Sequence, residues 1–388
     1  MFQKQPVAWL QLKHQKTRFL IALSGVIFAV VIVFMQFGIR DALFDSAVHL
    51  HHGLNGEIFL ISPRSTSLIA MDTFPDRRLK QVLAFPDVDF TVPIYVGFAQ
   101  WKNPQTRNYW RNIFLIGYDT RYKAFNLPGI VDTQALNIRD NIFFDQESRS
   151  EFGPIVEEFQ AKQIVTTEVS DFGSNHKVHV VGLFKLGTSF GADGNVITSD
   201  LNFLRINATR NKDIINIGLI KLKSGANIKK NVDQIKRYLP KDVKVFSKEE
   251  FIHFEKEYWQ SSTAIGFIFD IGVTLGIVVG IVVVYQILYT NVSEHLPEYA
   301  TLKAMGYRQQ YLLGLVLQQS LFIAVLGYIP GFIITIVQYE VTKAATLLPI
   351  GMTLERACFV FVATLAMCFI AGASAVRKLK DADPADIF

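Results

Sequence analysis

The sequence contains only two cysteines, Cys358 and Cys368, in 388 residues. Two cysteines supply neither a disulfide framework nor the paired CxxC ligands of a zinc site. Both lie in one apolar segment, where helical geometry would place them about 15 Å apart along the axis, too far for a disulfide. The chain must therefore be stabilised by packing and by its surroundings.

Charged residues are also scarce, because Asp, Glu, Lys and Arg make up 19% of the chain while 50% is hydrophobic. A soluble protein would carry about 25% charged residues, so part of the apolar content is expected to face lipid. The net charge of +5 is attributed to basic residues that flank apolar segments at the two chain ends, whereas a nucleic-acid-binding protein would gather them on one folded face. The composition predicts membrane and water-soluble parts in one chain, with no nucleic-acid partner.

No site for nucleotide hydrolysis is visible in the sequence. A P-loop needs the pattern GxxxxGK[ST], because its backbone and Lys together neutralise phosphates. The nearest match, GLFKLGTS at residues 182–189, has Thr188 in place of that Lys. The HExxH, GxSxG and zinc-spaced Cys and His patterns are missing as well. We expect a chain that is not an enzyme and carries no cofactor of its own.

Four apolar runs are long enough to cross a membrane, which takes about 20 helical residues. They are predicted as transmembrane helices at residues 19–37, 264–289, 312–338 and 357–376. The first run exceeds the apolar part of a signal sequence and no small-residue cleavage site follows it, so a retained anchor is favoured over a cleaved signal. Residues 1–18 are expected to form a cytoplasmic amphipathic N-terminus, or a frayed basic end that matters only for orientation.

The distribution of Lys and Arg predicts the orientation, because cytoplasmic segments carry an excess of them. The N-terminus and the tail at 377–388 each carry several Lys and Arg, and the link at 290–311 carries Lys303 and Arg308, so both termini are expected in the cytoplasm. The short loop at 339–356 and the long segment at 38–263 would then be periplasmic. The predicted fold class is a multi-pass α-helical protein of the inner membrane, with four transmembrane helices and a large α+β periplasmic domain inserted between helices 1 and 2.

The external segment mixes helix and strand patterns. Apolar residues at helical spacing after the first span, and again at residues 248–263, predict two stalk helices that pair. Between them, apolar runs bounded by Gly, Pro, Asn or Asp predict strands. These strands are expected at residues 56–62, 88–101, 109–118, 176–186 and 215–222, and short helices at 75–85 and 228–239.

Two polar features near the predicted membrane surface have competing interpretations. His49, His51 and His52 point in different directions on a helix, so solvated histidines are favoured over a metal site. Asp270 lies inside the second span, where a charge near the bilayer centre costs about 3 kcal/mol. It is a possible intramembrane polar site with a buried partner or a substrate-coupled role, but it lies about two turns from the external end and could instead sit near the interface.

Two glycine-rich features also have more than one interpretation. Gly272, Gly276 and Gly280 lie on one face of the second span and let another backbone approach, as a homodimer seam or as helix packing within one chain. The loop GTSFGADG follows a predicted strand and could be a surface turn, a substrate contact or a periplasmic dock. The residues assigned to the possible dock are Gly187, Thr188, Ser189, Phe190 and Gly191.

The link between spans two and three carries the signal of a short helix. Pro297 suits a first helical position and Gly306 a helix terminator. Leu302 and Met305 would share one side of this helix at the cytoplasmic ends of the spans. Alone, such a helix could merely cap the membrane surface.

The link sequence PEYATLKAMGYRQQYL resembles the coupling-helix motif E-x-A-x-L-K-A-M/I-G of FtsX- and MacB-type ABC transporter permeases, and the terminal DADPADIF resembles their C-terminal tail. The order of one span, a large external domain and three spans is also similar to theirs. Within that superfamily, VVGLFKLGTSFGADGNVITSDLNFLRI, QLKHQKTRFLIALSGVIFAVVIVFMQFGIRDALFDS and LHHGLNGEIFLISPRS resemble DevC-type permeases of cyanobacteria. The resemblance covers essentially the whole chain. It implies that the ATPase-coupling residues are Glu298, Ala300, Leu302, Lys303, Met305 and Gly306.

The resemblance also implies the partners and the activity. The chain would be the transmembrane subunit of a tripartite ABC exporter, paired as a homodimer in membrane lipid with two copies of a DevA-like ATPase that holds ATP and Mg²⁺. Its external MacB-like domain would engage a DevB-like membrane-fusion protein that leads to a TolC-like outer-membrane channel. The exported material would be glycolipid or another lipidic or hydrophobic substrate, driven by mechanotransmission from the ATPase.

Two other classes of function fit parts of the sequence. An FtsX-like mechanotransmitting regulator switches a periplasmic hydrolase and transports nothing, but such chains usually have a shorter external domain than this one. A membrane-bound enzyme or sensor would need a catalytic constellation outside or a signalling domain inside, and neither is visible. The exporter subunit is therefore the leading hypothesis.

Overall fold

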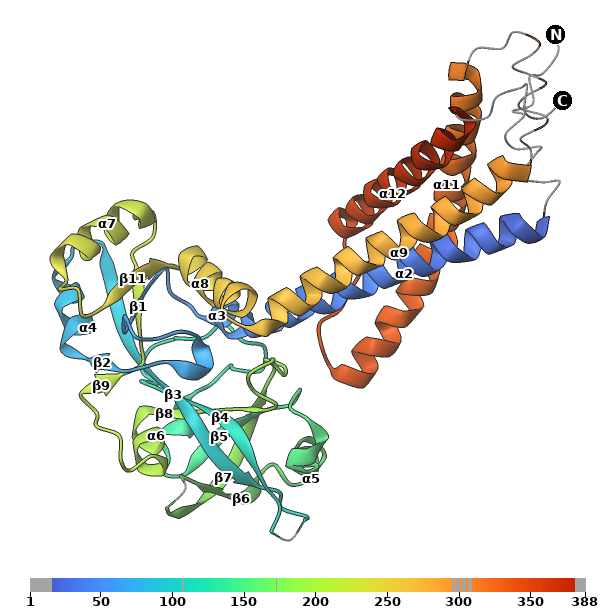
Figure 1. The fold of residues 1–388 in the computed structure, drawn as a ribbon. Coiled ribbons are helices and arrows are strands. Elements are labelled where there is room, and N and C mark those ends of the chain that lie inside the picture. Colours follow the sequence, from blue (N-terminus) through green and yellow to red (C-terminus); the bar gives the residue numbers. More distant parts are fainter. Residues whose placement is uncertain are drawn as a thin grey trace. The chain divides into compact units, whose positions relative to one another are not determined.

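The computed structural model describes residues 16–380 apart from 107, 172, 295–296, 298–300, 302–304 and 306–308. The chain divides into two compact units, which are coloured along the sequence in Figure 1. The first unit holds the described residues up to Ala42, residues Ala264–Thr346 and those from Ile350 onward. The second holds Leu43–Thr263 together with Leu347–Pro349.

The first unit consists of long apolar helices. They are α2 (Lys16–Ala47), α9 (Ala264–Glu294), α11 (Gln309–Thr346) and α12 (Leu354–Lys380). Each contains a stretch of at least 22 residues that is long and apolar enough to cross a membrane. The predicted fold class, with four membrane helices and a large α/β domain between the first and second, is confirmed.

Small residues bring these helices close together around α2. Gly327 and Gly331 on α11 lie against Val26 and Val30 of α2. Further along α2, the rings of Phe37 and Phe359 meet edge to face with centroids 5.1 Å apart, which joins α2 to α12. Because apolar side chains gain little from leaving lipid, close backbone approach and van der Waals contact hold such helices together.

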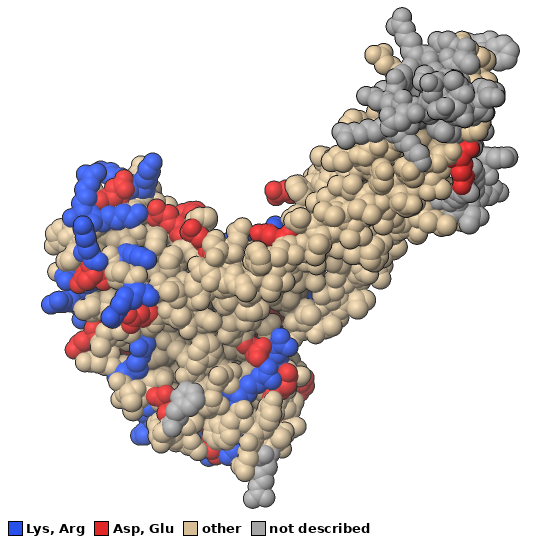
Figure 2. Space-filling view, viewed as in Figure 1, with Lys and Arg blue, Asp and Glu red and all other residues tan. Residues whose placement is uncertain are grey.

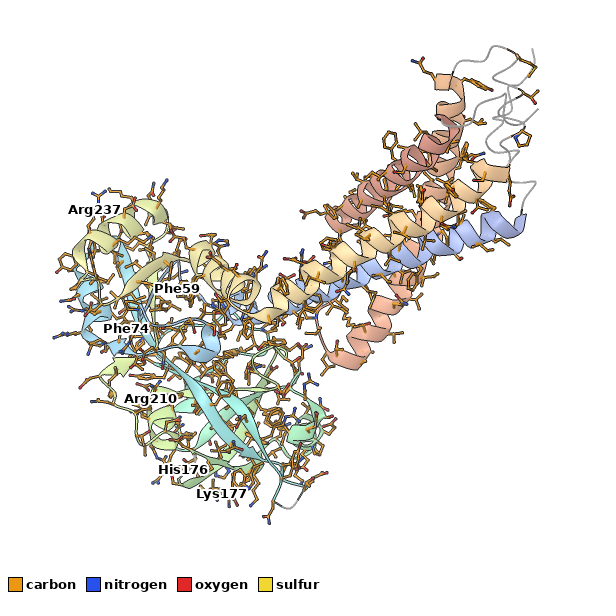
Figure 3. All side chains as sticks on the ribbon, in the orientation of Figure 1. Phe59, Phe74, His176, Lys177, Arg210 and Arg237 are labelled. Atoms are coloured by element: carbon orange, nitrogen blue, oxygen red, sulfur yellow. The ribbon has the colours of Figure 1, made fainter. Side chains whose placement is uncertain are left out.

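The second unit is built on a nine-stranded sheet. Its strands are β1 (Ile58–Ile61), β3 (Val88–Lys102), β4 (Trp110–Tyr118), β5 (Asn141–Asp145), β6 (Val165–Ser170), β7 (Asn175–Phe184), β8 (Asn195–Ser199), β10 (Ile217–Leu222) and β11 (Lys244–Ser247). Their order is β11-β1-β10-β3-β4-β8-β5-β7-β6. A separate pair joins β2 (Phe74–Pro75) to β9 (Ile214–Ile215). Figure 3 labels Phe59 on β1 and Phe74 on β2, two of the largest fully buried side chains.

Strand β3 belongs to two parts of this sheet. Its first half, to Ile94, pairs antiparallel with β10, and its second half pairs antiparallel with β4. Near its end, Gln100 and Trp101 also pair with β6. The six strands β3, β4, β8, β5, β7 and β6 therefore close on themselves, whereas β11, β1 and β10 extend the sheet from the first half of β3.

Helices cover the sheet and its edges. They are α3 (His49–Gly53), α4 (Arg77–Gln81), α5 (Ile155–Lys162), α6 (Asp200–Ile206), α7 (Ile228–Tyr238) and α8 (Lys248–Ser261), with short 3-10 turns at Leu68–Ala70 (η1), Val82–Ala84 (η2), Gln134–Asn137 (η3) and Ser150–Phe152 (η4). The Asn227 side chain caps α7 at the backbone N–H of Lys230, and Ser247 with Glu250 forms a capping box on α8. These caps satisfy N–H groups that a helix start leaves without partners.

Candidate functional site

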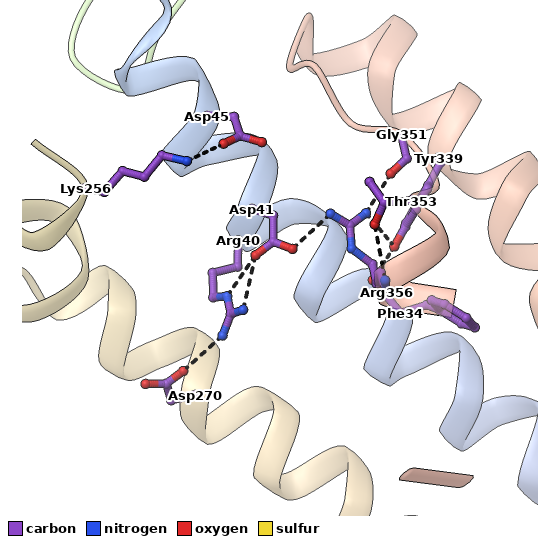
Figure 4. Close-up of polar contacts among 10 residues, drawn as sticks. All are labelled: Phe34, Arg40, Asp41, Asp45, Lys256, Asp270, Tyr339, Gly351, Thr353 and Arg356. Carbon is purple, nitrogen blue, oxygen red and sulfur yellow. Dashed lines mark hydrogen bonds and ion pairs between the residues drawn. The ribbon is translucent and has the colours of Figure 1, made fainter. Parts of the chain in front are cut away.

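Charged and aromatic side chains meet near one end of the membrane helices, as Figure 4 shows. Asp41 on α2 lies between two arginines. Its Oδ2 accepts a hydrogen bond of 2.9 Å from Nη2 of Arg356 on α12, and its Oδ1 accepts one of 3.1 Å from Nη2 of Arg40. Nη1 of Arg40 reaches Oδ1 of Asp270 on α9 at 3.5 Å. We call Arg40, Asp41, Asp270, Tyr339 and Arg356 the span network.

Tyr339 adds α11 to the span network. Its hydroxyl donates a 2.5 Å hydrogen bond to the carbonyl oxygen of Phe34 on α2, and the Arg356 guanidinium lies 5.7 Å from the centre of its ring. Nη1 of Arg356 also donates to the carbonyl oxygen of Gly351 over 2.6 Å. The network thus connects all four membrane helices through two carboxylates, two guanidinium groups and one phenol.

The contacts of the span network differ in strength. The Arg356 side chain is only 8% exposed, so its pairing with Asp41 takes place largely away from water and its loss would leave a charge without compensation. Asp270 is 61% exposed and its contact with Arg40 is long, which is the geometry of a weak surface pair. Asp270 is therefore the outermost member of the network and Asp41 its centre.

The three glycines of the second span face other helices of the same chain. Gly272 lies against Gln36 and Gly276 against Ile32 and Val33 of α2, while Gly280 lies between Ala29 of α2 and Met367 of α12. A methyl group on Gly272 or Gly280 would come within 3 Å of these neighbours. The small residues thus serve helix packing within one chain, which is one of the two interpretations left open by their spacing.

Most of the expected ATPase-coupling residues lie outside the described residues. These are Glu298, Ala300, Leu302, Lys303 and Gly306. The described neighbours are hydrogen-bonded at the spacing of one helical turn. The Thr301 hydroxyl donates to the carbonyl oxygen of Pro297 over 2.8 Å, and the backbone N–H of Met305 donates to the carbonyl oxygen of Thr301 over 3.0 Å. Met305 is 63% exposed, so its thioether is open to a partner.

In the external domain, α3 and α8 pack together, as expected for the two stalks. His51 of α3 lies against Phe251 of α8, with ring centroids 4.4 Å apart, and Nε2 of His51 is 3.8 Å from Oε2 of Glu255. Glu255 accepts hydrogen bonds from the backbone N–H of Leu68 at 2.7 Å and from the indole of Trp259 at 2.9 Å. Both His51 and Glu255 are 1% exposed.

Burial dominates the ionisation of this pair. Burial, helped by the nearby His52 and Lys248, lowers the pKa of His51 to about 3. Burial also raises the pKa of Glu255 to about 7, although its two hydrogen bonds act in the opposite direction. At neutral pH the imidazole is uncharged, and 3.8 Å is too long for a hydrogen bond. The expectation of solvated histidines is wrong for His51, because the pairing of the two stalks covers it.

The loop from Gly187 to Gly191 is held inward. Asp145, at the end of β5, accepts hydrogen bonds from the backbone N–H groups of Leu186 and Gly187, both at 3.0 Å, and from the Asn195 side chain at 2.9 Å. Burial raises the pKa of Asp145 in spite of these bonds. Gly187 has a φ of +89° and supplies the turn.

Only part of this loop is open to a partner. Thr188 is 3% exposed, whereas the Phe190 ring is 48% exposed and meets Trp259 of α8 edge to face at 5.0 Å. Gly187, Ser189 and Gly191 are half-buried. The possible dock at residues 187–191 therefore reduces to the Phe190 ring and its immediate surroundings.

The span network includes residues that sequence reasoning did not single out. Arg40, Asp41 and Arg356 were treated as boundaries of apolar runs, and Tyr339 as the start of a loop. The available signal was that opposite charges end two spans on the same predicted side, with Arg40 and Asp41 after the first and Glu355 and Arg356 before the fourth. Within the described part of the chain, no three His, Cys, Asp or Glu side chains converge on a position that could hold a metal ion.

Comparison with known proteins identifies the superfamily. The family described as MacB-like periplasmic core domain matches residues 19–238, and that described as FtsX-like permease C-terminal matches residues 271–384. No curated protein has a significantly similar sequence.

Two solved structures align with about half of the chain. The periplasmic region of MacB from Actinobacillus actinomycetemcomitans aligns at 11% identity with a TM-score of 0.36, over 51% of this chain and 92% of that one. The extracellular domain of the noncanonic ABC-type transporter YknZ from Gram-positive bacteria aligns at 15% identity with a TM-score of 0.35, over 50% of this chain and all of that one. Because the MacB-like family match alone spans more than half of the residues, this chain belongs to the FtsX- and MacB-like permeases, the inner-membrane components that work with an ATPase partner in ABC systems.

Proposed function

We propose that this permease is the transmembrane subunit of a tripartite ABC exporter of the DevC type. The observation that carries the proposal is the joining of an FtsX-like permease region to a MacB-like periplasmic core domain in one chain that lacks a P-loop. ATP and Mg²⁺ would be held by a separate, DevA-like ATPase. Two copies of the permease would form a homodimer with both termini in the cytoplasm.

The proposed mechanism is mechanical. The ATPase presses on residues 298–306, which join α9 to α11, and the push moves α9 and α11 relative to the lipid. The span network supports this idea, because its hydrogen bonds and ion pairs link those two helices to α2 and α12. Helix α2 runs without interruption from Lys16 to Ala47, so a displacement of α2 would be carried along its whole length.

The proposed external partners follow the family. The MacB-like domain would dock a DevB-like membrane-fusion protein, which leads to a TolC-like channel. The substrate would be glycolipid or another lipidic or hydrophobic molecule taken from the membrane. The match to a MacB-like core over residues 19–238 does not favour the alternative of an FtsX-like regulator of a hydrolase.

The test is association with the ATPase subunit. Leu302→Asp and Met305→Asp place a charge on the proposed coupling surface, and each is expected to reduce co-purification of the ATPase about tenfold or more, because an interface core excludes unpaired charges. Leu347→Asp makes the same chemical change at a residue that is 50% exposed and precedes α12, and it should have no effect. Equal co-purification of all three variants, each folded by thermal melting, would contradict the proposal.

A further inference from the structure

One layer of the external domain carries an unusual concentration of positive charge. The segments 76–84 and 228–243, which contain α4, η2 and α7, hold eight Lys and Arg against three Asp. Their net charge of +5 equals that of the whole chain. The positive charge was attributed above to the chain ends, but a folded surface holds as much of it. Figure 2 shows Lys and Arg gathered on the side of the domain where α4 and α7 lie.

The two helices form one rigid surface. Nε and Nη2 of Arg78 on α4 both donate to Oδ2 of Asp242, at 2.9 and 2.6 Å, just beyond the end of α7. The rings of Phe85 and Tyr238 meet edge to face at 5.3 Å. Beneath them, Leu79, Val82, Val232, Ile235 and Leu239 belong to one buried cluster. The charges therefore stand on a fixed scaffold, which a specific interface requires.

Several of these cations have no partner within the domain. They are Arg77, Lys229, Lys230, Arg237 and Lys241, which are all exposed and form no ion pair with a carboxylate in the described part of the chain. Lys80, Arg78 and Lys236, in contrast, are neutralised by Asp76, Asp242 and Glu250. Figure 3 labels Arg237 on α7. We call this surface the basic edge.

Apolar side chains stand among the unpaired cations. Tyr238 is 58% exposed and Leu83 is 53% exposed, on α7 and η2 respectively. Protein interfaces combine exposed aromatic and aliphatic anchors with a charged rim, and Arg and Tyr are among the residues enriched there. A soluble polyanion needs no such anchor. The mixture, with Asp233 interspersed on α7, favours a protein partner with an acidic rim around an apolar centre.

We infer that the basic edge docks an acidic surface of the periplasmic partner protein. Its cations would meet carboxylates around an apolar contact made by Tyr238 and Leu83. Complementary charge mainly speeds association and selects the partner. The inference rests on the proposed function, because it assigns the binding surface for the membrane-fusion protein to α4 and α7 and not to residues 187–191.

The experiment measures binding of the purified soluble part of the membrane-fusion protein to the full chain in phosphatidylcholine nanodiscs. The test variant is Lys229→Glu/Lys230→Glu/Arg237→Glu. The matched control, Lys123→Glu/Lys177→Glu/Lys185→Glu, makes the same charge change at exposed lysines elsewhere on the domain. The test variant should bind about tenfold or more weakly at 0.15 M salt and the control within twofold, and the difference should shrink at 0.5 M salt because salt screens exposed charges.

The possible results separate the inference from the function. A neutral variant, Lys229→Gln/Lys230→Gln/Arg237→Gln, removes the same charges without introducing repulsion. It should bind the fusion protein more weakly than the wild type but more tightly than the test variant, and its melting temperature should be unchanged. If the wild type binds and the folded test variant binds equally well, the basic edge is not the dock and the proposed function survives. If the wild type does not bind, both fall. If the variant loses only its attachment to phosphatidylglycerol vesicles, the surface recognises anionic lipid and the inference is overturned.

Discussion

Replacing Arg356 by Met tests whether the span network holds the membrane helices together. The change removes the guanidinium that pairs with Asp41 at 2.9 Å and with the Gly351 carbonyl oxygen at 2.6 Å. Breaking a fully buried pair costs about 3 to 5 kcal/mol and an exposed one about 0 to 1. Because Arg356 is 8% exposed and Asp41 35%, we expect a coupling energy of about 2 kcal/mol between them.

A double-mutant cycle isolates this coupling from other effects of each change. Arg356→Met, Asp41→Asn and the double variant are unfolded reversibly in mixed micelles of increasing SDS content, and the free energies of unfolding are compared. The same cycle for Arg40→Met and Asp270→Asn serves as the control, with an expected coupling of about 0.5 kcal/mol or less, since Asp270 is 61% exposed. Equal coupling in the two cycles, or none for the Asp41 pair, would refute the assignment of Asp41 as the centre of the network.

The other predictions concern the buried pair, the glycine face and the loop. Between about pH 4.5 and 6.5, His51 and Glu255 have opposite effects on the free energy of unfolding. The lowered pKa of His51 reduces stability as the pH falls, whereas the raised pKa of Glu255 increases it. Unfolding measured across this range should therefore show Glu255→Gln losing about 2 kcal/mol on acidification and His51→Gln gaining about as much; parallel slopes would contradict the reasoning. Gly276→Leu should destabilise the helices by about 1 to 3 kcal/mol through contact with Ile32 and Val33, whereas Gly314→Leu, which has open space around it, should melt like the wild type. Asp145→Ala should cost about 2 to 3 kcal/mol and speed hydrogen exchange at Leu186 and Gly187, because four donors, the Glu147 backbone N–H among them, lose this acceptor; unchanged exchange would show that the loop is held by other contacts.

The membrane part of the fold was predictable because hydrophobic length is a strong signal. The bilayer requires about 20 apolar residues and forbids unsatisfied backbone groups, and all four predicted spans lie within helices of the structure. Strands with long apolar runs, such as β3 and β10, were also recognised. Short strands such as β5 and β6, with five and six residues, were not recognised, because their pairing across the chain defines them more than their own composition.

The candidate site was less predictable because it depends on which side chains meet. Asp270 was noticed as a charge in an apolar run, but its partner Arg40 lies 230 positions away in the sequence. His51 was expected to be solvated because the three histidines point in different directions on a stalk helix, and only the packing of α3 against α8 buries it. Single residues carry little information about such contacts, whereas the local glycine pattern in α9 pointed directly to close helix packing.

Strand β3 has a further consequence for the external domain. Its first seven residues complete the open part of the sheet and its last nine complete the closed part, with Ile94 common to both. Neither part can lose this strand without exposing the hydrogen-bonding edges of its neighbours. The two parts must therefore gain and lose their order together, and a fragment that ends midway through β3 would present bare strand edges prone to aggregation.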